Sequence, residues 1–210
     1  WVSEIMLQQT RVEAVKPYYR RFLDALPDLP ALAAAGEDTL LKLWEGLGYY
    51  SRARNLQKAA RQAVERYGGE LPASYPLLLE LAGFGEYTAG AVASIAFGIR
   101  VPAVDGNVIR VVSRLLAAEG DSAGPAFRKA LRELLLETMP ETAPGEFNQA
   151  VMELGATLCA PNGPPRCPEC PLRDLCRGYR NGTPSAYPVK PPKKPRRVED
   201  RTVFVICSPG

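Results

Sequence analysis

The sequence predicts an all-α protein, on two main observations. Apolar residues recur at helical spacing along most of the chain; Ala89, Val92, Ala93 and Ala96, for example, fall at i, i+3, i+4 and i+7. Strict alternation of apolar and polar residues, the mark of a half-buried strand, is almost absent before residue 202. Because glycines and prolines divide the helical pattern into about ten segments, we expect packed helices.

The first expected helices cover residues 1–9, 12–26 and 37–45. Pro17 is expected to kink the second helix or to start it anew, and Pro27 and Pro30 are expected to end it. A fourth helix should end at Gly68-Gly69, and its apolar stripe consists of Leu56, Ala60, Val64 and Tyr67. A short apolar helix over residues 77–82 follows it.

A tight turn, Gly83-Phe84-Gly85, comes next. Both glycines can pass through positive φ without the steric cost of a Cβ. The helix after the turn is stopped by Gly98 and Pro102, and helices over residues 108–118, 126–138 and 147–158 complete the set. Two short helices around Gly-x-Gly form a helix-hairpin-helix, whose bare amides can hold a phosphate. An ordinary αα corner has the same pattern.

Composition limits the possible chemistry. The chain has 210 residues, enough for one or two domains, and 46% apolar residues, enough for a core. It contains no histidine, which excludes Ser-His-Asp and Cys-His nucleophiles and histidine-bound metals. No apolar run approaches the ~18 residues of a membrane span and no signal peptide is visible, so we expect a cytosolic protein that does not bind membranes. Because residue 1 is a tryptophan, we expect a preceding segment to be missing.

The net charge of +3 is unevenly spread. Residues 50–66 and 190–201 are both rich in lysine and arginine. Such stretches suit a polyanion, or they form an ordinary solvated face. Residues 180–197 also contain many prolines and are expected to be a linker, whereas residues 202–207 are expected to be a strand that includes Cys207.

Four cysteines, Cys159, Cys167, Cys170 and Cys176, form a C-x7-C-x2-C-x5-C cluster. Four thiols so close together indicate a metal site, because the alternative of two disulfides does not suit a cytosolic protein. Spacing alone does not separate a zinc site from an iron–sulfur cluster.

Four segments carry a resemblance to a known family. They are WVSEIMLQQT at residues 1–10, EGLGYYSRARNL at 45–56, VDGNV at 104–108 and FNQAVMELGA at 147–156. Together with the Gly83–Gly85 hairpin and Asp105 twenty residues after it, they resemble the helix-hairpin-helix DNA glycosylases, most of all the MutY-type adenine glycosylases. The resemblance extends over residues 1–180.

The resemblance implies a domain organisation. Two helical subdomains should flank a cleft: a helical-barrel subdomain with the hairpin at residues 1–100 and a cluster subdomain at residues 101–180. A linker at 181–201 would lead to the start of a truncated, Nudix-like C-terminal domain at 202–210. The resemblance also implies that the four cysteines hold a [4Fe–4S] cluster. The family spacing is C-x6-C-x2-C-x5-C, and this chain has one more residue in the first interval.

The implied activity is the release of adenine from duplex DNA, opposite 8-oxoguanine or guanine, by a monomeric enzyme of the bacterial cytosol. Glu4 would protonate the leaving base, and its apolar neighbours are expected to raise its pKa. Asp105 would stabilise the sugar cation or act as a transient nucleophile, kept ionised by the helix start that follows it. A plain N-cap at Asp105 and an exposed helix acid at Glu4 are the alternatives.

Further residues are assigned by the resemblance. Tyr87 and Asn107 would lie near the sugar, Gln149 would contact the adenine edge, and Gly83 and Gly85 would bind phosphate. The residues assigned to the opposite base are Gln9, Thr10, Leu47 and Tyr49, with core packing as the alternative for Leu47 and Tyr49 and a surface position for Gln9.

Tyr87 also predicts the reaction type. Related bifunctional glycosylases such as endonuclease III carry a lysine here that forms a Schiff base with the sugar. Residues 81–110 contain no lysine, so we expect a monofunctional glycosylase with water as the final acceptor. Two other hypotheses remain: a glycosylase of the same fold for thymine or uracil mismatches, and a non-catalytic DNA-binding module with a zinc site.

Overall fold

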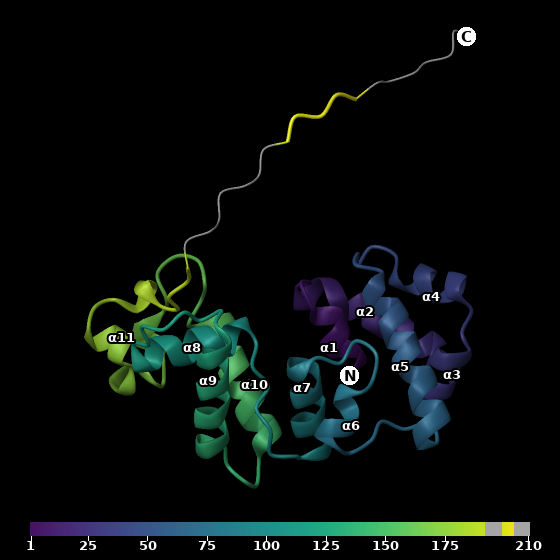
Figure 1. Ribbon diagram of the computed structural model, residues 1–210, viewed down its shortest axis with the longest axis horizontal. Helices are drawn as coiled ribbons and strands as arrows, with labels where there is room; N and C mark the ends of the chain where they lie inside the picture. Colours follow the sequence, from purple (N-terminus) through teal and green to yellow (C-terminus); the bar gives the residue numbers. More distant parts are fainter. Residues whose placement is uncertain (192–198, 204–210) are drawn as a thin grey trace.

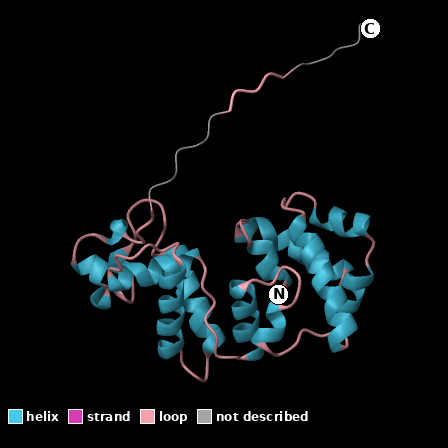
Figure 2. Cartoon of the chain, viewed as in Figure 1, coloured by secondary structure: helices cyan, strands magenta, loops and turns pink. Residues whose placement is uncertain are grey.

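The computed structural model describes residues 1–191 and 199–203 of the chain. All regular secondary structure in these residues is helical (Figure 2), which confirms the all-α prediction for them. The strand expected at residues 202–207 lies mostly outside the described residues, together with Cys207, and Thr202 and Val203 have no regular secondary structure. No helix in the described ranges is long and apolar enough to cross a membrane.

The first five helices enclose one hydrophobic core. They are α1 (Val2–Leu7), α2 (Val12–Ala25), α3 (Leu29–Ala34), α4 (Glu37–Trp44) and α5 (Ser51–Tyr67). Figure 1 shows them together, in purple to blue, in one part of the molecule. Phe22 and Trp44 are completely buried at the centre and meet edge to face, with ring centroids 6.0 Å apart.

The prolines of this region act only partly as the sequence analysis expected. Helix α2 runs through Pro17 as one element, so it does not start anew there, and it ends at Ala25, before Pro27, as expected. Helix α3 was not expected, because Pro27 and Pro30 were interpreted as breakers. Pro30 instead lies in the first turn of α3, where no backbone N–H is required, and the Asp28 carboxylate caps the helix by accepting a hydrogen bond from the Ala31 amide at 2.7 Å.

The hairpin consists of α6 (Tyr75–Leu79) and α7 (Glu86–Phe97) around the Gly83–Gly85 turn. Gly83 has φ +77°, as expected, but Gly85 has φ −91° and is extended, so only the first glycine requires a left-handed backbone. Between them, Phe84 is buried and stacks on Trp1 with ring centroids 5.4 Å apart. The turn is therefore anchored by its one side chain.

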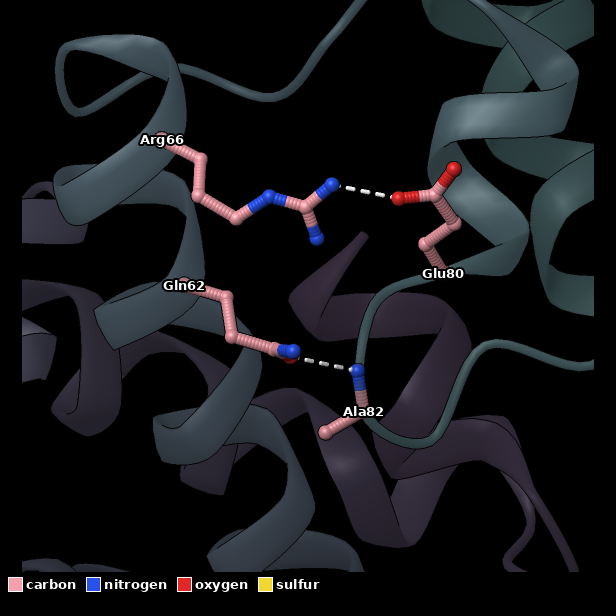
Figure 3. A network of polar contacts seen from close by, with 4 residues as sticks. All are labelled: Gln62, Arg66, Glu80 and Ala82. Carbon is pink, nitrogen blue, oxygen red and sulfur yellow. Dashed lines mark hydrogen bonds and ion pairs between the residues drawn. The ribbon is translucent and has the colours of Figure 1, made fainter.

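Two polar contacts fix the hairpin to α5 (Figure 3). The Ala82 amide donates a hydrogen bond of 2.8 Å to Oε1 of Gln62, and Arg66 forms an ion pair with Glu80. In Figure 3 both side chains of α5 point towards the chain that leads into the turn. Helix α5 thus sets the position of the hairpin.

The second part of the molecule contains α8 (Gly106–Leu116), α9 (Pro125–Thr138) and α10 (Pro144–Thr157). A separate core of Val108, Ile109, Val112, Leu131 and Leu135 holds α8 against α9. Helices α7 and α10 lie side by side where the two parts meet (Figure 1). Beyond α10, short turns and α11 (Arg177–Arg180) pack against α8. The predicted subdomain boundaries at residues 100 and 180 stay predictions.

Candidate active site

Glu4 and Tyr87 meet where α1, α7 and α10 come together. The Tyr87 hydroxyl donates a hydrogen bond of 2.8 Å to Oε2 of Glu4, and it lies 3.5 Å from Sδ of Met152 on α10. Glu4 and Tyr87 are both half-buried. Glu4 is therefore not the exposed helix acid of the alternative interpretation, because its carboxylate has a specific protein partner.

The Tyr87 phenol keeps its proton. Burial raises its pKa well above the ordinary range for tyrosine, the charge of Glu4 and the hydrogen bond to it raise it further, and the charge of Asp105 adds to this. Tyr87 thus lies within the electrostatic reach of both predicted catalytic acids. It can act as a hydrogen-bond donor but not as an anionic nucleophile at neutral pH.

Asp105 is the N-cap of α8. Its Oδ1 accepts a hydrogen bond of 2.8 Å from the Val108 amide, and its Oδ2 accepts one of 2.7 Å from Nδ2 of Asn107. The N-cap interpretation from the sequence is therefore correct as local structure. It does not exclude a chemical role, because the cap fixes a half-buried carboxylate at a helix start, where the helix dipole favours negative charge.

A chain of hydrogen bonds leads from Asp105 towards the cysteines. Oδ1 of Asn107 accepts a 2.7 Å bond from Arg110, whose Nε donates to the carbonyl oxygen of Cys159 at 2.7 Å. One turn later, Arg114 lies 3.3 Å from Sγ of Cys159. Two buried arginines of α8 thus connect the predicted catalytic acid with the cysteine loop.

A glycine allows α10 to approach this chain. A Cβ added to Gly155 would stand 2.6 Å from Cβ of Asn107, which is closer than two such atoms can come. The glycine also accepts a 2.7 Å hydrogen bond from Arg110 through its carbonyl oxygen. Gly155 therefore sets the place of Asn107 and, through it, of Asp105.

The four predicted metal ligands, Cys159, Cys167, Cys170 and Cys176, line one small cavity beside Arg114. Burial raises the pKa of the Cys167 thiol, and the charges of the other three cysteines raise it further, so the four sulfurs lie within electrostatic reach. No group of three or more cysteine or acidic side chains in the described residues has the arrangement of a metal-ion site. The donor set of four soft sulfurs nevertheless fits zinc or an iron–sulfur cluster.

The residues assigned to the opposite base lie in two loops. Gln9 and Tyr49 are exposed, and both have left-handed backbone, with φ 61° and 46°. Tyr49 exposes 62% of its surface, whereas Leu47 exposes 6% and packs into the core of the first five helices. Thr10 is half-buried. Tyr49 and its neighbour Tyr50 are both large exposed side chains of the second loop.

Gln149 lies exposed on α10, three residues before Met152, and donates a 3.3 Å hydrogen bond to the Gly145 carbonyl oxygen. Its carbonyl oxygen remains open to another donor. Gly83 and Gly85 are exposed at the hairpin, so their amides can be reached by an anion. The structure thus brings Glu4, Tyr87, Met152 and Asp105 together, and the remaining predicted residues lie in the separate loops, hairpin and helix face described above.

Most arginines of the basic stretch at residues 50–66 have partners within the protein, although several of them lie at its surface. Arg54 and Arg66 form ion pairs with Glu37 and Glu80, and Arg61 donates to the Ala33 carbonyl oxygen at 2.9 Å. The half-buried guanidinium of Arg52 bonds only to main-chain carbonyls within the described residues. Arg54, Arg61 and Arg66 are exposed, so the binding of a polyanion by this stretch stays a prediction.

Residues 2–137 match the family described as HhH-GPD superfamily base excision DNA repair protein. This match covers more than half of the chain. The chain belongs to the HhH-GPD superfamily. The matched residues include α6, α7 and the connection that leads to Asp105.

Curated HhH-GPD relatives share extensive sequence with the chain. It is 47% identical over 195 residues to the adenine DNA glycosylase of Mus musculus, with 91% of the chain covered, and 48% identical over 178 residues to that of Homo sapiens, with 84% covered. The chain spans 38% of the mouse protein and 32% of the human protein.

Solved HhH-GPD structures share the fold. A thermostable thymine-DNA glycosylase superposes with a TM-score of 0.77 at 30% identity, covering 86% of this chain and 82% of that one. A non-covalent endonuclease III–DNA complex superposes with a TM-score of 0.72 at 26% identity, covering 86% and 83%. These matches confirm the predicted fold class.

Sequence reasoning gave no role to several residues that hold together the segments around the candidate site. Arg52, Arg110 and Asn148 had no place in it, because each acts through main-chain carbonyls or amides contributed by distant segments. Asn148 is 2% exposed, accepts a 3.1 Å bond from the Ala103 amide and donates to Ser94 and the Val101 carbonyl oxygen. A polar residue on the apolar face of a helix was the available signal for Asn148.

Proposed function

We propose that this chain is the catalytic part of a monofunctional adenine DNA glycosylase, which releases adenine paired with 8-oxoguanine or guanine after the base has been flipped out of the duplex. The observation that carries the proposal is the contact between Tyr87 and Glu4 at 2.8 Å, within electrostatic reach of Asp105. The similarity to adenine DNA glycosylases at 47–48% identity supports the choice of base.

The chemistry follows from the two acids. As the N-glycosidic bond breaks, its electron pair goes to the base, and Glu4 donates a proton to that base. The sugar becomes an oxocarbenium-like cation, which the Asp105 carboxylate stabilises. Water then adds to the sugar carbon and loses a proton. Because Tyr87 remains a donor, it stabilises the carboxylate that Glu4 becomes after proton transfer.

The lack of an amine supports water as the acceptor. Residues 81–110 contain no lysine, and a protonated phenol cannot form an imine with the sugar. Borohydride should therefore trap no covalent complex between the chain and cleaved DNA. A strong trapped adduct with the unmodified sequence would contradict the monofunctional assignment.

We also propose that Cys159, Cys167, Cys170 and Cys176 hold a [4Fe–4S] cluster. Their shared cavity, the soft donor set and membership of a superfamily that includes endonuclease III support this. When bound, the cluster would supply structural cross-linking of the loop. Chemical analysis should find about four iron atoms per chain and a broad visible absorbance. One zinc per chain and a colourless protein would contradict the proposal.

A base-release assay tests the function directly. Duplexes with adenine opposite 8-oxoguanine, adenine opposite guanine, and thymine or uracil opposite guanine are compared under single turnover. We expect release of adenine alone, by a chain that binds one duplex as a monomer. Release of thymine or uracil instead would favour the alternative suggested by the similarity to a thymine-DNA glycosylase.

Glu4→Gln should abolish release while leaving DNA affinity within about 3-fold, because the amide keeps the shape but has no acidic proton. Glu13→Gln is the matched control, since Glu13 is an exposed acid on α2 whose partner is the exposed Lys16. If Glu4→Gln retained the full rate, the assignment of the acid would be wrong. If neither variant nor the parent chain released any base, the chain would be a DNA-binding module.

A further inference from the structure

Arg52, the second residue of α5, joins two segments that lie far from one another in the sequence. Its five hydrogen bonds all go to main-chain carbonyl oxygens, three at the end of α1 and two in the loop after α4. The acceptors are Ile5 at 2.8 Å, Met6 at 3.1 Å, Gln8, Leu47 at 3.0 Å and Gly48 at 3.4 Å. One guanidinium therefore fixes both segments to each other and to α5.

Main-chain carbonyl groups, three of them at the end of α1, balance the charge of Arg52. Among the described residues no carboxylate bonds to it, whereas the carbonyls of a last helical turn lack helical partners and carry the negative end of the helix dipole. The guanidinium also lies over the rings of Trp44 and Tyr49, with its central carbon 5.5 Å from each ring centroid. The terminal N–H groups of the guanidinium share the carbonyl acceptors, while the buried Nε has no hydrogen-bond partner within the described residues. The compact ammonium of a lysine cannot reproduce this planar spread of contacts.

Each segment held by Arg52 ends in an exposed residue with left-handed backbone, Gln9 in the first and Tyr49 in the second. Such a conformation costs about 1 kcal/mol or more for a residue with a Cβ, so the surrounding contacts must maintain it. Glu4 directly precedes the first carbonyl that Arg52 binds. The loops that would enter DNA and the helix that carries the acid thus share one fixed point.

We propose that Arg52 is a positioning residue that couples insertion of the Gln9 and Tyr49 loops into the duplex to the placement of Glu4 beside the extruded base. This rests on the proposed glycosylase function. Because both segments bond to the same guanidinium, a displacement of the Tyr49 loop is transmitted to the end of α1. Without the guanidinium, the loops still meet DNA, but Glu4 is no longer held in register with them.

The kinetic test compares Arg52→Gln and Arg52→Lys with the matched control Arg54→Gln. Arg54 is exposed on the same helix, and within the described part of the chain its side chain bonds only to Glu37, at 2.8 Å. At saturating enzyme we expect single-turnover release to fall by about 100-fold in Arg52→Gln, the effect of a misplacement near 1 Å, and by less in Arg52→Lys. Arg54→Gln should stay within about 2-fold, because an exposed pair contributes little.

Affinity is measured in parallel on a duplex whose target adenine carries a 2′-fluorine, which resists cleavage. We expect the affinity of Arg52→Gln to fall by far less than its rate, since the role of Arg52 lies in aligning the acid. A loss confined to affinity, or a rate within 2-fold of the parent, would overturn the proposal. Melting temperatures of all variants establish that the comparison is made on folded protein.

Hydrogen exchange followed by mass spectrometry separates this inference from the proposed function, because it requires no activity. In free Arg52→Gln and Arg52→Lys, amides in residues 5–10 and in residues 46–50 should both exchange faster than in the parent, and neither should change in Arg54→Gln. If the parent releases no adenine, the proposed function fails, and this measurement still decides whether the segments are coupled. Faster exchange in one segment alone would refute the coupling.

Discussion

Tyr87 contacts one predicted catalytic acid, Glu4, and is affected by the charge of the other, Asp105. Its hydroxyl donates to Glu4 at 2.8 Å, and the charges of both Glu4 and Asp105 contribute to the raised pKa that keeps it protonated. A hydrogen-bond donor in this place stabilises the charged carboxylate form of Glu4. Tyr87 should therefore influence the chemical step without being the group that transfers the proton.

Replacing Tyr87 by Phe removes this donor while keeping the ring. We expect single-turnover adenine release to fall by about 10- to 100-fold, the equivalent of one hydrogen bond to a charged group, with little change in DNA affinity. Because its raised pKa keeps the phenol protonated through the neutral range, Tyr87 itself should add no titration step to the pH–rate profile. Tyr19→Phe on α2, in the first core, is the control and should leave the rate unchanged.

At the residue scale, the sequence predicted the acids but not their supports. Glu4, Tyr87 and Asp105 lie in motifs that a reader of the sequence can recognise, and the structure places them near one another. Arg52 and Arg110 could not be predicted, since their partners are backbone carbonyls that folding brings together from distant segments. Side-chain chemistry is visible in a sequence, whereas the direction of a carbonyl is not.

The hairpin shows how one element depends on another. Gly83 has left-handed backbone, and a Cβ added there would meet Cβ of Asn55 on α5 at 2.9 Å. Gly85 is extended, and a Cβ there would meet nothing within 4 Å. Although the two glycines were predicted to be equivalent, only Gly83 is required by backbone conformation and by packing against α5.

Gly83→Ala and Gly85→Ala should therefore differ. We expect Gly83→Ala to lower the free energy of unfolding by about 1–3 kcal/mol, from the left-handed conformation and the contact with Asn55. Gly85→Ala should change it by less than about 0.5 kcal/mol, as for an exposed site without strain. Urea unfolding of both variants measures this, and equal losses would show that the turn geometry is wrong.

Among the elements, existence was easier to predict than boundaries. The apolar stripes of α2 and α5 were recognised, and Gly68 ends α5 in a left-handed cap as expected. The short helix α3 was missed because two prolines resemble a break, while the Asp28 cap that starts the helix was overlooked. The expected helix over residues 77–82 ends at Leu79, since the Gln62 contact draws the Ala82 amide away from helical bonding.

At the scale of the whole molecule, α7 and α10 join the two helical parts. Asn148 of α10 is almost completely buried there and bonds to Ser94, Val101 and Ala103. Its neighbour Gln149 is exposed and faces away from this contact. Adjacent residues of one helix thus serve the joint between the parts and the proposed base-binding surface respectively.

Asn148→Ala and Gln149→Ala should accordingly affect different properties, the first stability and the second the choice of base. Asn148→Ala leaves buried groups of the 101–103 segment without partners, so we expect a loss of about 2–4 kcal/mol in the free energy of unfolding. Gln149→Ala should leave stability within about 0.5 kcal/mol and instead weaken discrimination for adenine. Thermal unfolding and base-release assays on both variants provide the comparison; a stable Asn148→Ala protein would contradict this view of the joint.

The architecture as a whole was predicted through motifs, not through physics alone. Helical spacing predicted the class, and the resemblance predicted a fold that the structural matches confirm. The arrangement of the two parts depends on buried contacts such as those of Asn148 and on the close approach of Gly155 to Asn107, which no periodicity reveals. The predicted C-terminal strand falls mainly on residues outside those described.

The phenol at position 87 also determines the DNA product of the proposed reaction. With no amine beside the sugar, the proposed reaction ends with both strands continuous and one deoxyribose stripped of its base. Such a sugar opens slowly to an aldehyde and is prone to spontaneous breakage. A separate hydrolase that incises DNA beside abasic sugars must therefore act on the product of the proposed reaction.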